Sequence, residues 1–105
     1  MVEAADAIAR YAAKGRDHFD TDSEVRDAIL YQITVLGEAA KAALAAEPGL
    51  ETAAPEIEWS PIARMRDRVI HHYWTTDNEI VWSTATESVP QIRTKLAKLL
   101  TRLSS

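Results

Sequence analysis

The stretch "SEVRDAILYQITVLGEAAKAALAA", residues 23–46, decides the fold because it predicts one long helix with apolar residues on two sides. Two stripes recur at helical spacing, one made of Val25, Ile29, Leu36 and Ala40 or Ala43, the other of Leu30, Ile33, Gly37 and Leu44. Asp22 or Ser23 can cap its first turn, and "EPG" at 47–49 ends it. Two apolar sides fit a central helix of a bundle or a dimer contact.

Gly37 lies inside this helix, where glycine costs about 1 kcal/mol relative to alanine. We expect a neighbouring helix to approach closely at this position.

Three further helices are predicted around the long one. The first covers about 2–14 and breaks at Gly15, and the decapeptide 14–23 is expected to be turn or loop. After a connection over 50–59, Ser60 is expected to cap a helix over about 61–74 with Pro61 at its first position. Its core stripe comprises Ile62, Met65, Val69 and either His72 or Tyr73.

The last helix is expected to start at a cap on Thr76 or Asp77. Its core seam comprises Ala85, Val89, Ile92, Leu96, Leu99 and Leu103. Pro90 lies within this seam and should either kink the helix or open a new segment in its first turn. The fold class is therefore an all-α, up-and-down bundle of the four-helix type.

Composition narrows the function. With 105 residues and 11.7 kDa, the chain fits a single domain over 1–105. The net charge of −4 argues against a broad nucleic-acid-wrapping surface, so any anion site must be local. The absence of cysteine excludes disulfides, thiolate zinc sites and cysteine nucleophiles. No apolar run resembles a membrane span and the N-terminus is unlike a signal peptide, so we expect a cytoplasmic protein.

The stretch "RMRDRVIHHYW", residues 64–74, concentrates the candidate chemistry. Asp67 and His71 are one helical turn apart, so the carboxylate can orient the imidazole. Arg66 and Tyr73 are almost two turns apart and project along nearly the same line. Arginine, histidine and tyrosine on one surface suit metal-free RNA cleavage, in which His71 accepts the 2′-hydroxyl proton and Arg66 holds the phosphoryl oxygens. This mechanism needs no cofactor.

Structural interpretations compete with this one. Arg64, Arg66 and Arg68 also fit a solvated, ion-paired helix face, and His71 fits a structural histidine. His72 fits a packing or surface role. Tyr73 and Trp74 both fit core aromatics, and for Trp74 this is the expectation that we keep. A metal site is not favoured, because adjacent histidines on a helix point about 100° apart.

The order Arg66-x4-His71-x-Tyr73 resembles the motif of the HEPN ribonucleases, and its context is similar to the HepT-like toxin family. The matching context comprises "LGEAAK" (36–41), "EWSPIARMRDRVIHHYW" (58–74), "TDNEIVW" (76–82) and "VPQI" (89–92), over roughly residues 22–103.

The resemblance implies a homodimeric toxin whose two motifs face a shared cleft and cleave RNA without metal, with Arg66, His71 and Tyr73 as catalytic residues. It also implies a cognate antitoxin, a minimal nucleotidyltransferase that transfers AMP to Tyr73. Arg64, Arg68, Asp67 and His72 would support the site, the arginines by making the cleft locally positive. The alternative is a non-catalytic HEPN-like module for dimeric interaction or nucleotide binding.

Overall fold

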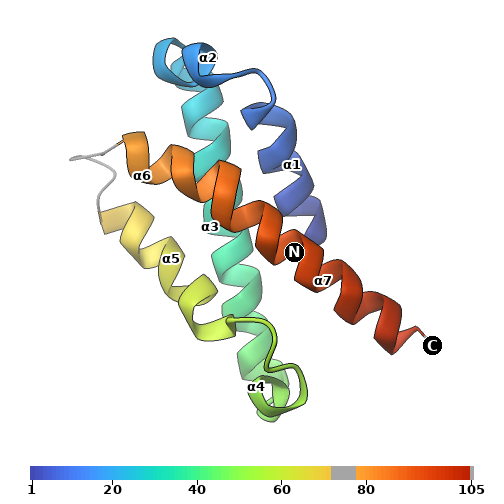
Figure 1. Ribbon diagram of the computed structural model, residues 1–105. Coiled ribbons are helices and arrows are strands. Elements are labelled where there is room, and N and C mark those ends of the chain that lie inside the picture. Colours follow the sequence, from blue (N-terminus) through green and yellow to red (C-terminus); the bar gives the residue numbers. More distant parts are fainter. Residues whose placement is uncertain (72–77, 105) are drawn as a thin grey trace.

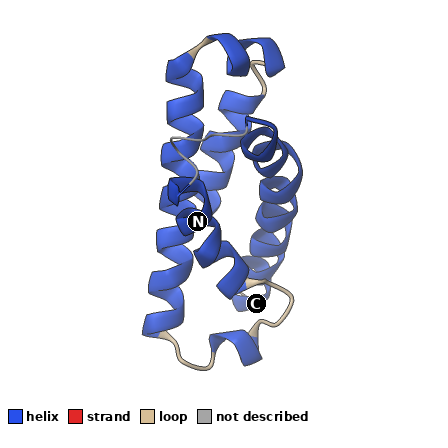
Figure 2. Ribbon diagram, turned by 90° about the vertical axis from the view of Figure 1, so that its left-hand side faces the viewer, coloured by secondary structure: helices blue, strands red, loops and turns tan. Residues whose placement is uncertain are grey.

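A computed structural model describes residues 1–71 and 78–104, and for Ile70 and His71 it describes the backbone alone. The described part is helical and contains no strand (Figure 2), which confirms the all-α fold class. The elements are α1 (Val2–Ala12), α2 (Arg16–Thr21), α3 (Ser23–Ala46), α4 (Leu50–Ala53), α5 (Trp59–His71), α6 (Asn78–Ser83), the π-helix η2 (Thr84–Ser88) and α7 (Val89–Leu103).

Helix α3 is the central element. Helices α1 and α5 both pack against it, and α6, η2 and α7 form a continuous rod that runs diagonally across the front of the molecule and contacts α1 (Figure 1). Asp22 caps α3 as predicted, because its side chain accepts a hydrogen bond of 2.9 Å from the backbone N–H of Glu24. The largest fully buried side chains comprise Phe19, Ile8, Ile29, Ile33, Leu36 and Val89. The up-and-down order of a four-helix bundle remains a prediction.

Of the helices that the structure describes, α3 alone is long and apolar enough to meet the criteria for a membrane span. The sequence had led us to expect none. Its apolar residues Val25, Ile29, Ile33 and Leu36 are buried in the core against the neighbouring helices, whereas Tyr31 and Val35 are exposed.

The expected loop over 14–23 is wrong, because this segment contains the short helix α2. Gly15 separates α1 from α2 with a φ of 96°, a backbone conformation that glycine adopts at little cost. Phe19 is fully buried, and Arg26 of α3 donates from Nη1 to the backbone oxygens of Phe19 and Asp20, at 2.9 and 2.7 Å. These tertiary contacts favour a helix in a segment of polar residues that local propensity left as loop.

Helix α5 begins at Trp59, two residues before the predicted start. Ser60 therefore lies inside its first turn, and the Ser60 hydroxyl donates to Glu51 Oε1 at 3.0 Å, so the prediction of a Ser60 cap is wrong. The earlier start is fixed by Trp59, which is buried and donates from Nε1 to the Ala54 carbonyl at 3.1 Å. The connection before α5 also contains a short helix, α4.

Pro90 opens a new segment in its first turn, one of the two outcomes predicted. Helix α7 starts at Val89, whose backbone N–H bonds to the carbonyl of Thr84, five residues earlier. Pro90 has no N–H, and in a continuous α-helix its ring would crowd the carbonyl of Thr86, so the wider π-turn relieves the conflict.

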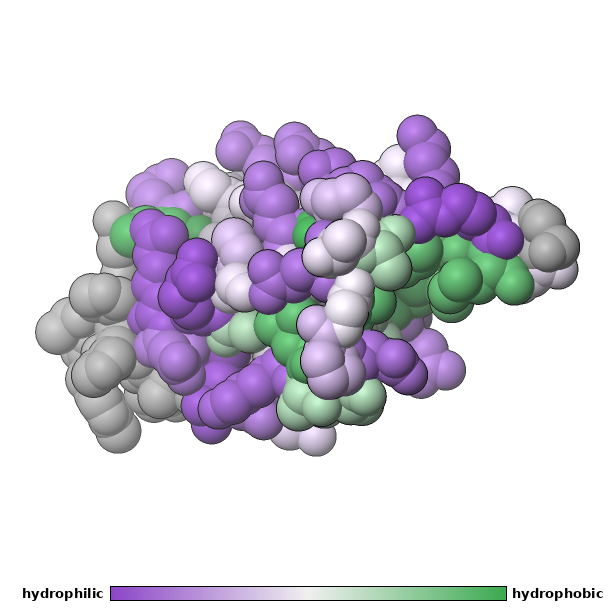
Figure 3. Space-filling model, turned by 90° about the horizontal axis from the view of Figure 1, so that it is seen from below, coloured by the Kyte–Doolittle hydropathy of each residue, from purple (hydrophilic) through white to green (hydrophobic). Residues whose placement is uncertain are grey.

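The predicted seam of α7 is correct in its interior and wrong at its end. Ala85, Val89, Leu96 and Leu99 are buried and Ile92 packs partly against the core, but Leu103 is 72% exposed. Helix α7 extends beyond the rest of the bundle, and Figure 3 shows apolar surface at this end of the molecule, to which Leu100 and Leu103 contribute. The predicted caps at Thr76 and Asp77 lie outside the described residues.

Helix α5 approaches α3 closely at Gly37, as predicted. A Cβ atom at Gly37 would lie 2.5 Å from the Cβ of Arg66 and 3.3 Å from the carbonyl oxygen of Ile62. The first distance is far below van der Waals contact, so a side chain here would force the two helix backbones apart.

We therefore expect Gly37→Ala to lower the free energy of unfolding by about 1–3 kcal/mol, although alanine favours an isolated helix by about 1 kcal/mol. The measurement is urea denaturation followed by circular dichroism. Gly49→Ala is the matched control, because a Cβ there meets nothing within 4 Å, and it should change stability by no more than about 0.5 kcal/mol. Equal stability of the two variants would contradict the close approach.

Candidate active site

Arg66 is positioned by the crossing of α5 over α3. Its Cβ packs against Gly37, and its Nε lies 2.7 Å from Oε1 of Glu38, the next residue on α3. The Nε–H is buried and has no acceptor in line with it, so this contact is an ion pair rather than an aligned hydrogen bond. At the other edge of the guanidinium, Nη1 donates to Asp67 Oδ1 at 2.9 Å.

The guanidinium is held but not enclosed. The Arg66 side chain is 33% exposed, and its Nη2 makes no hydrogen bond with the described residues. The terminal nitrogen Nη2 therefore remains able to donate a charge-assisted hydrogen bond to a phosphoryl oxygen. The geometry thus suits anion binding at Nη2.

Asp67 lies beside Arg66 on α5. Within the described part it pairs with Arg66, whereas its predicted partner is the imidazole of His71. The backbone of His71 belongs to α5, but its side chain lies outside the described residues, as do His72 and Tyr73. The pairing of Asp67 with His71 and the roles of His71, His72 and Tyr73 remain predictions.

The structure does not bring the three arginines of the motif together. Arg64 and Arg68 border a groove between α5 and α7, whereas Arg66 lies against α3. Residues two apart on a helix are separated by about 200°, so Arg66 is directed to a different side of α5 from the other two. The single positive cluster expected from the sequence is therefore divided between two surfaces of one protomer.

Sequence reasoning missed Glu38, the carboxylate that holds Arg66. It is part of the stretch "LGEAAK" (36–41), which contributed to the family resemblance. The position of Glu38 within its own helix could not predict a contact with a residue on another helix. Gly37 in the same stretch was singled out, and its neighbour on α5 proves to be Arg66.

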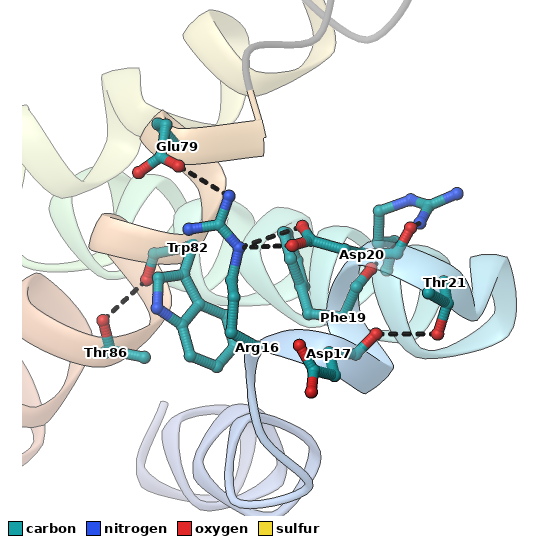
Figure 4. Close-up of polar contacts among 9 residues, drawn as sticks. Arg16, Asp17, Phe19, Asp20, Thr21, Glu79, Trp82 and Thr86 are labelled. Atoms are coloured by element: carbon teal, nitrogen blue, oxygen red, sulfur yellow. Dashed lines mark hydrogen bonds and ion pairs between the residues drawn. The ribbon is translucent and has the colours of Figure 1, made fainter.

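A second missed feature is the Arg16 cluster, comprising Arg16, Phe19, Asp20, Glu79 and Trp82 (Figure 4). Arg16 donates from Nε to the carboxylate of Asp20 at 2.9 and 3.0 Å and from Nη2 to Glu79 Oε1 at 2.6 Å. Its guanidinium carbon lies 5.9 Å from the ring centroids of both Phe19 and Trp82. The cluster joins α2 to α6, the helix that follows the motif in the chain.

The positive charge of Arg16 and the negative charge of Glu79 stabilise each other. The hydrogen bond from Arg16 lowers the pKa of the Glu79 carboxyl below its ordinary value, and the hydrogen bonds to Glu79 and Asp20 raise the pKa of Arg16. The Glu79 carboxyl therefore stays ionised at neutral pH, and its hydrogen bond with Arg16 links the start of α6 to α2. Among the described side chains, which exclude those of residues 70–77 and 105, no three from His, Asp or Glu are grouped closely enough to hold a metal ion.

Comparison with known proteins identifies the family. The model of the family described as ribonuclease HepT-like matches residues 1–99. The chain belongs to the HepT-like ribonuclease family.

Two archaeal relatives illustrate the similarity. A probable ribonuclease HepT of Thermococcus cleftensis is 32% identical over 83 residues, which are 79% of this chain and 73% of the relative. A protein of Methanocaldococcus jannaschii whose name describes it as a putative RNase is 32% identical over 74 residues, 70% of this chain and 59% of the relative. No solved structure matches the chain.

Proposed function

We propose that this HepT-like chain is the toxin of a toxin-antitoxin pair and that it cleaves RNA without a metal ion. The observation that carries the proposal is the fixed guanidinium of Arg66, held by Gly37 and Glu38, in a chain that belongs to this family. Cytoplasmic RNA is the proposed substrate. The Thermococcus relative, named as a probable ribonuclease, supports the same activity.

In the proposed reaction, His71 accepts the proton of a ribose 2′-hydroxyl, whose oxygen attacks the adjacent phosphorus. The bond from the 2′-oxygen to phosphorus forms as the bond to the 5′-oxygen of the next nucleotide breaks, and that 5′-oxygen takes up a proton. Arg66 stabilises the negative charge that accumulates on the phosphoryl oxygens. The products carry a 2′,3′-cyclic phosphate and a 5′-hydroxyl.

A second candidate function is a non-catalytic interaction or nucleotide-binding module. The pairing of Arg66 with both Glu38 and Asp67 favours this candidate, because two carboxylate partners also fit a purely structural role for the guanidinium. The two candidates differ in whether Arg66 is needed for turnover.

The proposal includes a homodimer, supported by the exposed side of α3. Tyr31 is 66% exposed and Val35 is 37% exposed, one helical turn apart, and Glu38 lies on the same side of the helix. A second copy covering this apolar surface would approach the Glu38–Arg66 pair of the first copy. Two motifs would then share one cleft.

We expect sedimentation equilibrium at micromolar concentration to show a dimer, and Tyr31→Glu to shift it towards monomer by placing a charge in the contact. Leu103→Glu is the control, because Leu103 is equally exposed but lies at the far end of α7. A monomeric wild type, or dissociation by Leu103→Glu alone, would contradict a dimer through α3.

We expect Arg66→Ala and His71→Ala each to reduce the rate of RNA cleavage by about 100-fold or more while the fold is retained. Cleavage should persist in EDTA, and the products should end in 2′,3′-cyclic phosphate or its hydrolysed form. Arg93→Ala removes a comparable surface ion pair, with Asp6, and should leave the rate unchanged. Inhibition by EDTA, or products with a 3′-hydroxyl, would exclude the mechanism, and full activity of Arg66→Ala would support a structural role for Arg66.

We also propose that a minimal nucleotidyltransferase antitoxin transfers AMP to Tyr73. The tyrosine oxygen would attack the α-phosphorus of ATP and release pyrophosphate, and the bulky anionic product would repel RNA. Mass spectrometry after incubation with this partner, ATP and magnesium should show added AMP on the wild type and none on Tyr73→Phe. An undiminished yield on Tyr73→Phe would place the modification elsewhere, and full cleavage by the modified protein would remove Tyr73 from regulation.

A further inference from the structure

A groove separates α5 from η2 and α7. Its volume is about 560 Å³, which falls within the usual range for small-molecule sites and is sufficient for a single nucleotide. Ile57, Ile62, Met65 and Ile92 give it an apolar lining, and Ser88 and Gln91 add polar groups from the opposite wall. This feature is called the basic groove below because of the cations that border it.

Three of the residues lining the basic groove are cations, namely Arg64 and Arg68 on α5 and Lys95 on α7. None of them makes an ion pair or side-chain hydrogen bond with the described residues, whereas the nearby arginines Arg66, Arg93 and Arg102 are all ion-paired. Among the described residues of the lining, Glu58 is the one carboxylate. These described residues contribute three positive charges and one negative charge, a sum of +2, on a chain whose net charge is −4.

Unpaired cations around a concave apolar surface are suited to a ligand that is both anionic and planar. Arg64 and Arg68 are one turn apart, about 6 Å along α5, which is comparable to the distance between successive phosphates of an extended strand. A guanidinium can bind each phosphate through two parallel hydrogen bonds. The apolar lining can hold the face of a base, and Gln91 can bond to the edge of the base.

We propose that the basic groove binds nucleotides of single-stranded RNA that flank the cleavage site. The proposal rests on the proposed ribonuclease function and adds a second contact for the substrate, on a different side of α5 from Arg66. Because one short helix carries both sites, a strand that crosses α5 can contact Arg66 and the groove at the same time. Binding in the groove would then contribute affinity for long RNA.

RNA fits the groove better than an acidic peptide does. Carboxylates on a peptide could pair with the same cations, but a peptide backbone would also bring amide groups onto the apolar lining, where few partners satisfy them. A nucleotide presents its phosphates and its flat apolar face on separate sides, as the rim and the lining do. An acidic peptide is therefore the competing ligand in the test.

The test uses a fluorescently labelled, single-stranded 2′-O-methyl RNA, which the protein cannot cleave because the attacking hydroxyl is blocked. Binding is followed by anisotropy at several salt concentrations. Each lost phosphate contact should reduce the slope of log affinity against log salt by about 0.7. We expect Lys95→Gln to reduce the slope by about this amount and the triple variant Arg64→Gln/Arg68→Gln/Lys95→Gln to reduce it by about 2.

Lys98→Gln is the matched control, because it removes the same charge from the same helix at an exposed lysine that does not line the groove. Its slope should equal that of the wild type. A 4-thiouridine in the same RNA should crosslink to peptides that contain Met65 or Ile92. An unchanged slope in the correctly folded triple variant, crosslinks confined to other peptides, or tighter binding of a leucine–glutamate peptide than of RNA would overturn the proposal.

Cleavage of unmodified RNA by the wild type separates this proposal from the proposed function. If the wild type cleaves RNA and the triple variant binds RNA as the wild type does, the proposed role of the groove is overturned and the proposed ribonuclease activity is not. Groove-dependent RNA binding without any cleavage would support RNA binding by the groove and contradict the proposed ribonuclease activity. Absence of RNA binding by the wild type would overturn the groove.

Discussion

The close contact between Gly37 of α3 and Arg66 of α5 determines how the two helices cross. With a Cβ-to-Cβ distance of 2.5 Å for any side chain at position 37, only glycine lets these two backbones approach so closely. The close approach fixes the position of α5 along the axis of α3. It therefore also fixes where the side chain of Arg66 projects from α5. The cost of glycine inside a long helix is about 1 kcal/mol and is offset by this packing.

The same crossing gives Arg66 its electrostatic surroundings. Glu38 follows Gly37 directly, so the helix that admits the Arg66 backbone also supplies the carboxylate that restrains its side chain. The Arg66 side chain remains 33% exposed, and its Nη2 makes no hydrogen bond with the described residues. Two adjacent residues of α3 thus restrain Arg66, Gly37 by packing and Glu38 by charge.

Helix α5 directs its arginines into two different environments, because Arg66 lies on a different side of the helix from Arg64 and Arg68. Arg66 is paired with carboxylates and restrained, whereas Arg64 and Arg68 border an apolar groove and have no partner among the described residues. On an acidic protein, unpaired cations beside a concave surface make a local anion site that the net charge conceals. One side of α5 is proposed to hold the reacting phosphate and the other the flanking nucleotides.

The sequence by itself determined the features whose causes are local. Asp22 and "EPG" bound α3, Gly15 ends the first helical segment, Pro90 opens α7, and helical periodicity marks most of the core. These outcomes depend on caps, backbone conformation and a missing N–H, all within a few residues of chain. The order Arg66-x4-His71-x-Tyr73 likewise required only the sequence, and it led to the correct family.

Tertiary structure alone decided which residues meet. Arg16 and Glu79 are 63 positions apart, and their contact, with the burial of Phe19, makes a helix of a segment that local propensity left as loop. The pairing of Glu38 with Arg66 and the separation of Arg66 from Arg64 and Arg68 depend on where α5 crosses α3 and where α7 lies. The physical reason is that the energies of such contacts arise between helices, whereas the patterns in a single sequence record only the preferences within each helix.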